Sequence, residues 1–147
     1  EIINESDTPY DSKKFSQYVD HFPPSSDFDG YIVHYKTSDK NFIIMALEGV
    51  IVYKDNISEC YQMKKKIVAD LKKTFNNSKT TSWQRSHVAD KTGKSKTDAT
   101  QFDFKEGGHS RVTCNDWSEN MNYTDKLTVS IITKEFERWI QDEAYAN

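Results

Sequence analysis

The chain has 147 residues, of which 35% are hydrophobic and 29% charged, and its formal net charge is -3. This length is close to the commonest size of one folded domain. An aromatic content of 13% and a small net charge exclude a disordered chain, and only five Gly and three Pro exclude collagen-like and low-complexity sequences. The longest apolar run, residues 42–47, is far shorter than the roughly 20 residues of a membrane-spanning helix.

No internal repeat divides the chain, and no segment has the composition of a linker. We therefore expect residues 1–147 to form a single α+β domain, with residues 1–8 flexible. The chain begins at Glu1, which fits a mature protein that has lost a signal peptide and equally fits a shortened chain.

A short helix is expected first, over residues 11–22. Asp11 can cap it, two prolines end it, and its apolar residues recur at helical spacing: Phe15, Tyr18, Val19 and Phe22.

A β-hairpin is expected next, because residues 31–35 alternate, residues 37–41 have turn chemistry and residues 42–47 form an apolar run. Glu48 and Gly49 then interrupt the apolar pattern. We expect a bulge at this pair, with the strand resuming over residues 50–53.

The strongest helical signal covers residues 56–75. Asn56 and Glu59 have the spacing of a capping box, and an apolar stripe follows that includes Cys60. Lys64 interrupts this stripe. We expect its aliphatic stem to run along the apolar surface and its ammonium group to reach solvent, with a buried cation as the alternative.

Four further strands are expected, over residues 80–88, 97–105, 110–116 and 126–132, and Gly107-Gly108 gives a strong hairpin signal between the second and third. Thr133 can cap a last helix. The predicted fold is therefore α+β, with a single antiparallel sheet of five or six strands, made from a hairpin and a meander. The helix at about 56–75 packs on this sheet, and N- and C-terminal helices complete it.

Cys60 and Cys114 are the only cysteines, 54 residues apart. Neither has a second Cys or a His at the spacing of a zinc ligand, so we predict a disulfide between them rather than a metal site. Such a bond favours an exported protein, periplasmic or extracellular. Four Asn-x-Ser/Thr triplets point weakly the same way: Asn4, Asn56, Asn76 and Asn122.

Basic residues concentrate between positions 64 and 96, although the pI is near 5.8. Most such clusters are solvated surfaces. The alternative is a module that binds an anionic partner, namely nucleic acid, a lipid head group or an acidic protein, and the low pI argues against nucleic acid. The residues that would carry this binding lie on the outer arc of the long helix: Lys65, Lys66, Lys72 and Lys73.

No catalytic motif is present, and no cofactor or metal is expected. Thr92-Gly93-Lys94-Ser95 lacks the upstream Gly of a phosphate-binding loop. Asp103, Glu106 and His109 surround one hairpin and are interpreted as turn residues rather than metal ligands.

A cysteine-dependent hydrolase is a further alternative. It would use Cys114 as nucleophile, with His87 or His109 as base and Asp116 as orienting group. A cysteine that faces the core and has a potential disulfide partner argues against it.

The most distinctive polar and aromatic segment lies at the end of the predicted strand 110–116 and contains Asn115, Asp116, Trp117 and Tyr123. These residue types are typical of recognition surfaces. The sequence therefore favours a small exported, non-enzymatic binding protein whose partner is a protein or a small ligand. It contacts that partner through this segment, a sheet edge or a pocket between sheet and helices. The sequence determines neither the partner nor the oligomeric state.

Overall fold

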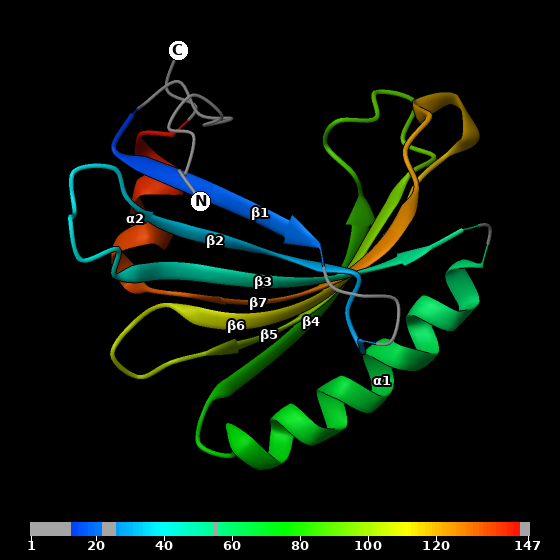
Figure 1. Cartoon of the computed structure of the whole chain (residues 1–147). Coiled ribbons are helices and arrows are strands. Elements are labelled where there is room, and N and C mark those ends of the chain that lie inside the picture. The colour runs from blue at the N-terminus through cyan, green and yellow to red at the C-terminus, as the bar shows by residue number, and fades with distance from the viewer. Residues whose placement is uncertain (1–12, 22–25, 55, 145–147) are drawn as a thin grey trace.

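One antiparallel sheet of seven strands forms the framework of the protein, in the order β1-β2-β3-β7-β6-β5-β4 (Figure 1). The computed structural model describes residues 13–21, 26–54 and 56–144. The strands are β1 (Phe15–His21), β2 (Gly30–Lys36), β3 (Ile44–Tyr53), β4 (Lys79–Ser86), β5 (Lys96–Asp103), β6 (His109–Asp116) and β7 (Asp125–Ile132). The helices are α1 (Ile57–Thr74), α2 (Lys134–Asp142) and the short 3-10 helix η1 (Glu119–Met121). The expected five or six strands are therefore too few.

The extra strand is β1, in the segment that we expected to be a helix. Phe15, Tyr18 and Val19 have helical spacing, but the segment pairs with β2 along its whole length, from Phe15 opposite Lys36 to His21 opposite Gly30. The prediction of an N-terminal helix is wrong because aromatic and β-branched residues also favour strands. The backbone pairing of β1 with β2 decides in favour of a strand. The proposed cap, Asp11, the residues from Phe22 to Pro24 and the segment 1–8 lie outside the described residues.

Helix α1 explains the strand order, because it carries the chain from β3 to the far edge of the sheet at β4. The last four strands then return as a meander until β7 pairs with β3. Helix α1 begins as expected at Asn56, whose side chain accepts from the Glu59 N–H at 3.4 Å and donates to Glu59 Oε1 at 2.7 Å.

The two helices cover opposite faces of the sheet. On β7, Leu127 and Val129 contact α1, whereas Ile132 packs against the α2 cluster, and residues at odd and even positions of a strand face opposite sides. Helix α2 closes its side with Phe136 and Trp139, whose ring centroids lie 5.2 Å and 4.7 Å from that of Phe15.

Strand β3 is continuous through Glu48 and Gly49, so the bulge expected there is wrong. The irregularity in β2–β3 pairing lies at His34 and Tyr35, which oppose Ala46 and Ile44 and leave Met45 as the extra residue. Gly49 has a different role. A Cβ on Gly49 would lie 2.8 Å from the ring of Phe28, so the glycine allows that ring to rest directly on the strand.

Candidate functional site: an apolar cleft between α1 and the sheet

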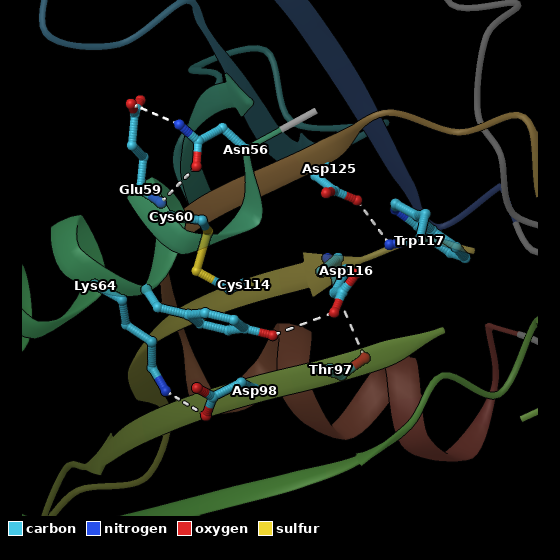
Figure 2. Close-up of a disulfide and its surroundings, with 12 residues drawn as sticks. Asn56, Glu59, Cys60, Lys64, Thr97, Asp98, Cys114, Asp116, Trp117 and Asp125 are labelled. Atoms are coloured by element: carbon cyan, nitrogen blue, oxygen red, sulfur yellow. Dashed lines mark hydrogen bonds and ion pairs between the residues drawn. A yellow bond between two sulfur atoms is a disulfide. The ribbon is translucent and has the colours of Figure 1, made fainter. Parts of the chain in front are cut away.

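A disulfide joins the first turns of α1 to the middle of the sheet. Cys60 and Cys114 are both fully buried, and their Cα atoms lie 6.1 Å apart (Figure 2). The predicted disulfide is confirmed. Because it leaves Cys114 without a thiol, the nucleophile needed by the hydrolase alternative is absent from this structure.

An ion pair reinforces the disulfide one helical turn further along α1. Lys64 Nζ lies 2.6 Å from Asp98 Oδ1 on β5, and only 7% of Lys64 is exposed (Figure 2). The expectation that this ammonium group reaches solvent is wrong. Its charge is instead compensated by a carboxylate on the sheet, as a buried cation requires.

A third contact on this half of α1 is the hydrogen bond that the Tyr61 hydroxyl donates to Asp116 Oδ2 at 3.4 Å. Burial, together with the charges of Asp116 and Asp98, raises the pKa of Tyr61 to about 12. Burial and the nearby Asp125 raise the pKa of Asp116 above its ordinary value. The N-terminal half of α1 is thus held by a covalent bond, an ion pair and a hydrogen bond.

The C-terminal half of α1 is held by apolar contacts of Ile67, Val68 and Leu71 with the core, and an apolar cleft of about 650 Å³ opens beside Leu71 and Phe75. Helix α1 packs mainly over β6 and β7 and reaches only one part of β3, where Ile51 and Tyr53 share its apolar cluster, so an apolar cleft remains over β2 and residues 44–49 of β3. Phe75, just after the helix, contacts Phe102 and Phe104, with ring centroids 5.9 Å and 5.1 Å away. The cleft is lined by Phe28, Tyr31, Val33, Ile44, Leu47, Glu48, Gly49, Leu71, Phe75, Ser110, Val129, Ser130 and Ile131.

Few polar groups reach this cleft. The Glu48 carboxylate lies 3.4 Å from His34 Nε2, and the His34 ring contacts Phe136 of α2, so this side chain is directed to the other face. The Tyr31 hydroxyl donates to Asp20 Oδ2 at 3.4 Å. Neither pair supplies the nucleophile and base that bond cleavage needs. An apolar molecule in this cleft would be shielded from water.

The segment singled out from the sequence does not converge on one point. Asp116 faces α1, whereas Asn115 accepts a hydrogen bond from Thr97 Oγ1 at 3.2 Å on the opposite face. The ring centroid of Trp117 lies 4.1 Å from that of His87 and 4.8 Å from that of Tyr123. This aromatic group lies at the end of the sheet where η1 and the β4–β5 loop are found.

The remaining candidate residues are at the surface or already paired. Lys65, Lys66, Lys72 and Lys73 are all exposed on α1, and Lys73 Nζ lies 2.8 Å from Asp70 Oδ1. His109, by contrast, is buried, and its Nδ1 lies 2.9 Å from Glu137 Oε1 of α2. Burial and the nearby Arg111 lower the pKa of His109. His109 therefore bonds to α2 rather than forming a cluster with Asp103 and Glu106.

Sequence reasoning missed the cleft residues, although it located most of the elements that carry them. Val33, Val129 and Ile131 belong to apolar alternations that were assigned simply to the core. One signal was available. The apolar face of a wide sheet exceeds what one helix can cover, so some of that face has to remain open.

No family model, curated protein or solved structure is significantly similar to this chain. Among the described residues, neither helix is long and apolar enough to cross a membrane.

Proposed function

We propose that the protein is an exported, non-enzymatic binding protein that holds an apolar small molecule in the cleft between α1 and the sheet. The observation that carries this proposal is the cleft itself. Its volume of about 650 Å³ lies within the range of about 300–1,000 Å³ that small-molecule sites occupy, and its walls are almost entirely apolar.

The way α1 is attached supports this function. Three bonds hold the first half of the helix, while Leu71 and Phe75 approach the sheet only through apolar contacts. Apolar contacts can rearrange around a ligand without leaving a polar group unpaired. The end of α1 near Phe75 can therefore adjust to a ligand while the disulfide keeps the helix in place.

The Cys60–Cys114 disulfide supports export, since such bonds persist in oxidising compartments. It also suits a protein that leaves an apolar surface open for a ligand, because a crosslink stabilises the fold without requiring more core.

The test is a fluorescence titration with the neutral apolar probe 1-N-phenylnaphthylamine. Leu47 and Ile131 line the cleft and are 39% and 46% exposed, so Leu47→Trp and Ile131→Trp should fill it without disturbing the core. We expect each to weaken probe binding about tenfold, judged by the midpoint of the titration, because the probe and the indole compete for one volume.

Val52→Trp is the matched control. Val52 lies on the same strand as Leu47 with a similar exposure of 41%, but it faces the other side of the sheet. We expect it to bind the probe like the wild type. Absence of probe binding to the wild-type protein, or equal weakening by all three variants, contradicts the proposed function.

A further inference from the structure

Exposed apolar side chains gather at the mouth of the cleft. Nine large apolar residues of the described chain are exposed, and five of these lie together on the β2–β3 loop and the cleft wall: Phe42, Ile43, Ile44, Leu47 and Ile131. Phe42, Ile43 and Ile44 are consecutive and are 54%, 60% and 54% exposed. Ile44, the first residue of β3, directly follows Phe42 and Ile43 of the loop and also lines the cleft, so the two apolar surfaces are continuous.

The loop holds these side chains outward in a fixed conformation. The Asp39 carboxylate accepts hydrogen bonds from the Asn41 N–H at 2.9 Å and the Ile43 N–H at 3.1 Å. Phe42 has a φ of 50°, a region that bulky residues rarely adopt, and its ring lies against Tyr35 with centroids 5.4 Å apart. A strained aromatic residue at an exposed tip, rather than a Gly, indicates a use for its apolar surface.

The size of this tip indicates what covers it. Three side chains that are each slightly more than half exposed offer far less than the roughly 800 Å² that each partner buries in a stable protein–protein interface. A small apolar tip is enough to enter the boundary between lipid head groups and acyl chains. Lys40, exposed beside the tip, can contact lipid phosphates there.

We propose that the protein docks on a phospholipid bilayer through the β2–β3 loop, with Phe42 and Ile43 inserted among the lipids. The mouth of the cleft at Ile44 then opens toward the apolar layer from which a ligand can enter. This inference rests on the proposed function, since it names the source of the ligand that the cleft holds. The ligand is therefore of a kind that partitions into membranes.

The test is co-flotation with vesicles of phosphatidylcholine, alone or mixed with phosphatidylglycerol. We expect binding to both, and about fivefold tighter binding to the mixture because of Lys40. The variant Phe42→Asn/Ile43→Ser removes the apolar tip, and Asn tolerates the positive φ. We expect it to lose vesicle binding at least tenfold and to bind 1-N-phenylnaphthylamine like the wild type, because neither residue lines the cleft.

Two further variants complete the test. Ile43→Ser alone keeps the contact between Phe42 and Tyr35, so a loss of vesicle binding in this variant is not a folding defect. Val88→Ser is the matched control, since Val88 is 85% exposed on the β4–β5 loop at the other end of the sheet, and we expect no loss of vesicle binding from it.

The outcomes separate the two proposals. Probe binding in solution without flotation overturns membrane docking and leaves the cleft function intact. Flotation without probe binding overturns the cleft function, and with it the supply of a ligand from the membrane. A wild-type dimer that the loop variants convert to monomers, without flotation, identifies the tip as a contact between copies of this chain and overturns membrane docking.

Discussion

The ion pair between Lys64 and Asp98 joins the middle of α1 to β5 across 34 residues of sequence, with its two charged atoms 2.6 Å apart. The side chain of Lys64 is 8% exposed and that of Asp98 is 27% exposed. Removal of the partner charge should therefore destabilise the protein more when Lys64 is left unpaired than when Asp98 is. Along α1, the pair lies between the disulfide at Cys60 and the cleft residue Leu71.

This asymmetry gives the first prediction. Asp98→Asn leaves a buried ammonium group without its counter-charge, and we expect the free energy of unfolding in urea to fall by about 3 kcal/mol. The double variant Lys64→Met/Asp98→Leu replaces both charges with apolar groups and should unfold within about 1 kcal/mol of the wild type. Equal unfolding free energies of the single and double variants would show that an unpaired charge on Lys64 does not destabilise the folded protein.

The second prediction concerns the disulfide. In the chain-entropy model, a bond between Cys60 and Cys114, 54 residues apart, stabilises the fold by about 4 kcal/mol. We expect Cys60→Ala/Cys114→Ala and the reduced wild-type protein to lose stability by similar amounts in urea denaturation. The number of alkylatable thiols should be two only after reduction. Two reactive thiols in the untreated protein contradict the disulfide.

The third prediction concerns Asp90, whose carboxylate organises the β4–β5 loop. It accepts hydrogen bonds from Ser95 and Thr92, through both N–H and hydroxyl groups, and from Ser118 Oγ at 2.9 Å. These bonds stabilise the charged form and hold the pKa of Asp90 well below its usual range.

The sign of the pH dependence follows from that lowered pKa. Because the unfolded chain binds the proton more readily, the stabilisation is complete above the usual carboxyl pKa of about 4 and is lost as pH falls from there toward the lower folded value. Asp90→Asn should therefore lower Tm at pH 7 and weaken the dependence of Tm on pH below 4. Asp27→Asn changes the same net charge at an exposed position and should leave both unchanged. A wild-type acid dependence retained in Asp90→Asn would contradict this role.

The fourth prediction compares two glycines of positive φ. A Cβ on Gly93, at φ 72°, would meet only Ser86 Oγ at 3.7 Å. A Cβ on Gly108, at φ 79°, would lie against the carbonyl oxygen of Ile132 and 2.9 Å from Lys134 N. We expect Gly93→Ala to cost about 1 kcal/mol of unfolding free energy and Gly108→Ala about 3 kcal/mol, because the connection from β7 to α2 would have to move. Thermal unfolding of the two variants in parallel measures the difference, and equal Tm values would rule out the close approach.

The sequence located those elements whose signals are local. Asn56 and Glu59 are three residues apart, so their reciprocal capping could be predicted without knowing anything else of the fold. Gly107 and Gly108 likewise indicated their own turn, and both adopt positive φ. The pairing of Cys60 with Cys114 followed from there being only two cysteines and no plausible metal site.

Non-local pairing decided the features that were predicted wrongly. Phe15, Tyr18 and Val19 suit a helix as well as a strand, and a strand forms because β2 provides hydrogen bonds along the whole segment. Lys64 was expected at the surface because nothing near it in sequence indicates that Asp98, on β5, lies opposite. Gly49 suggested a bulge, whereas it makes room for Phe28 from the connection between β1 and β2.

The amino-acid sequence by itself determined which segments are amphipathic, where α1 begins and which cysteines pair, because each depends on neighbouring residues or on a simple count. Only the tertiary structure decided that α1 packs mainly over β6 and β7 while a cleft stays open over β2 and residues 44–49 of β3. That opening depends on where a helix held at one end crosses a twisted sheet. This placement follows from the summed packing of many side chains, and no local pattern encodes it.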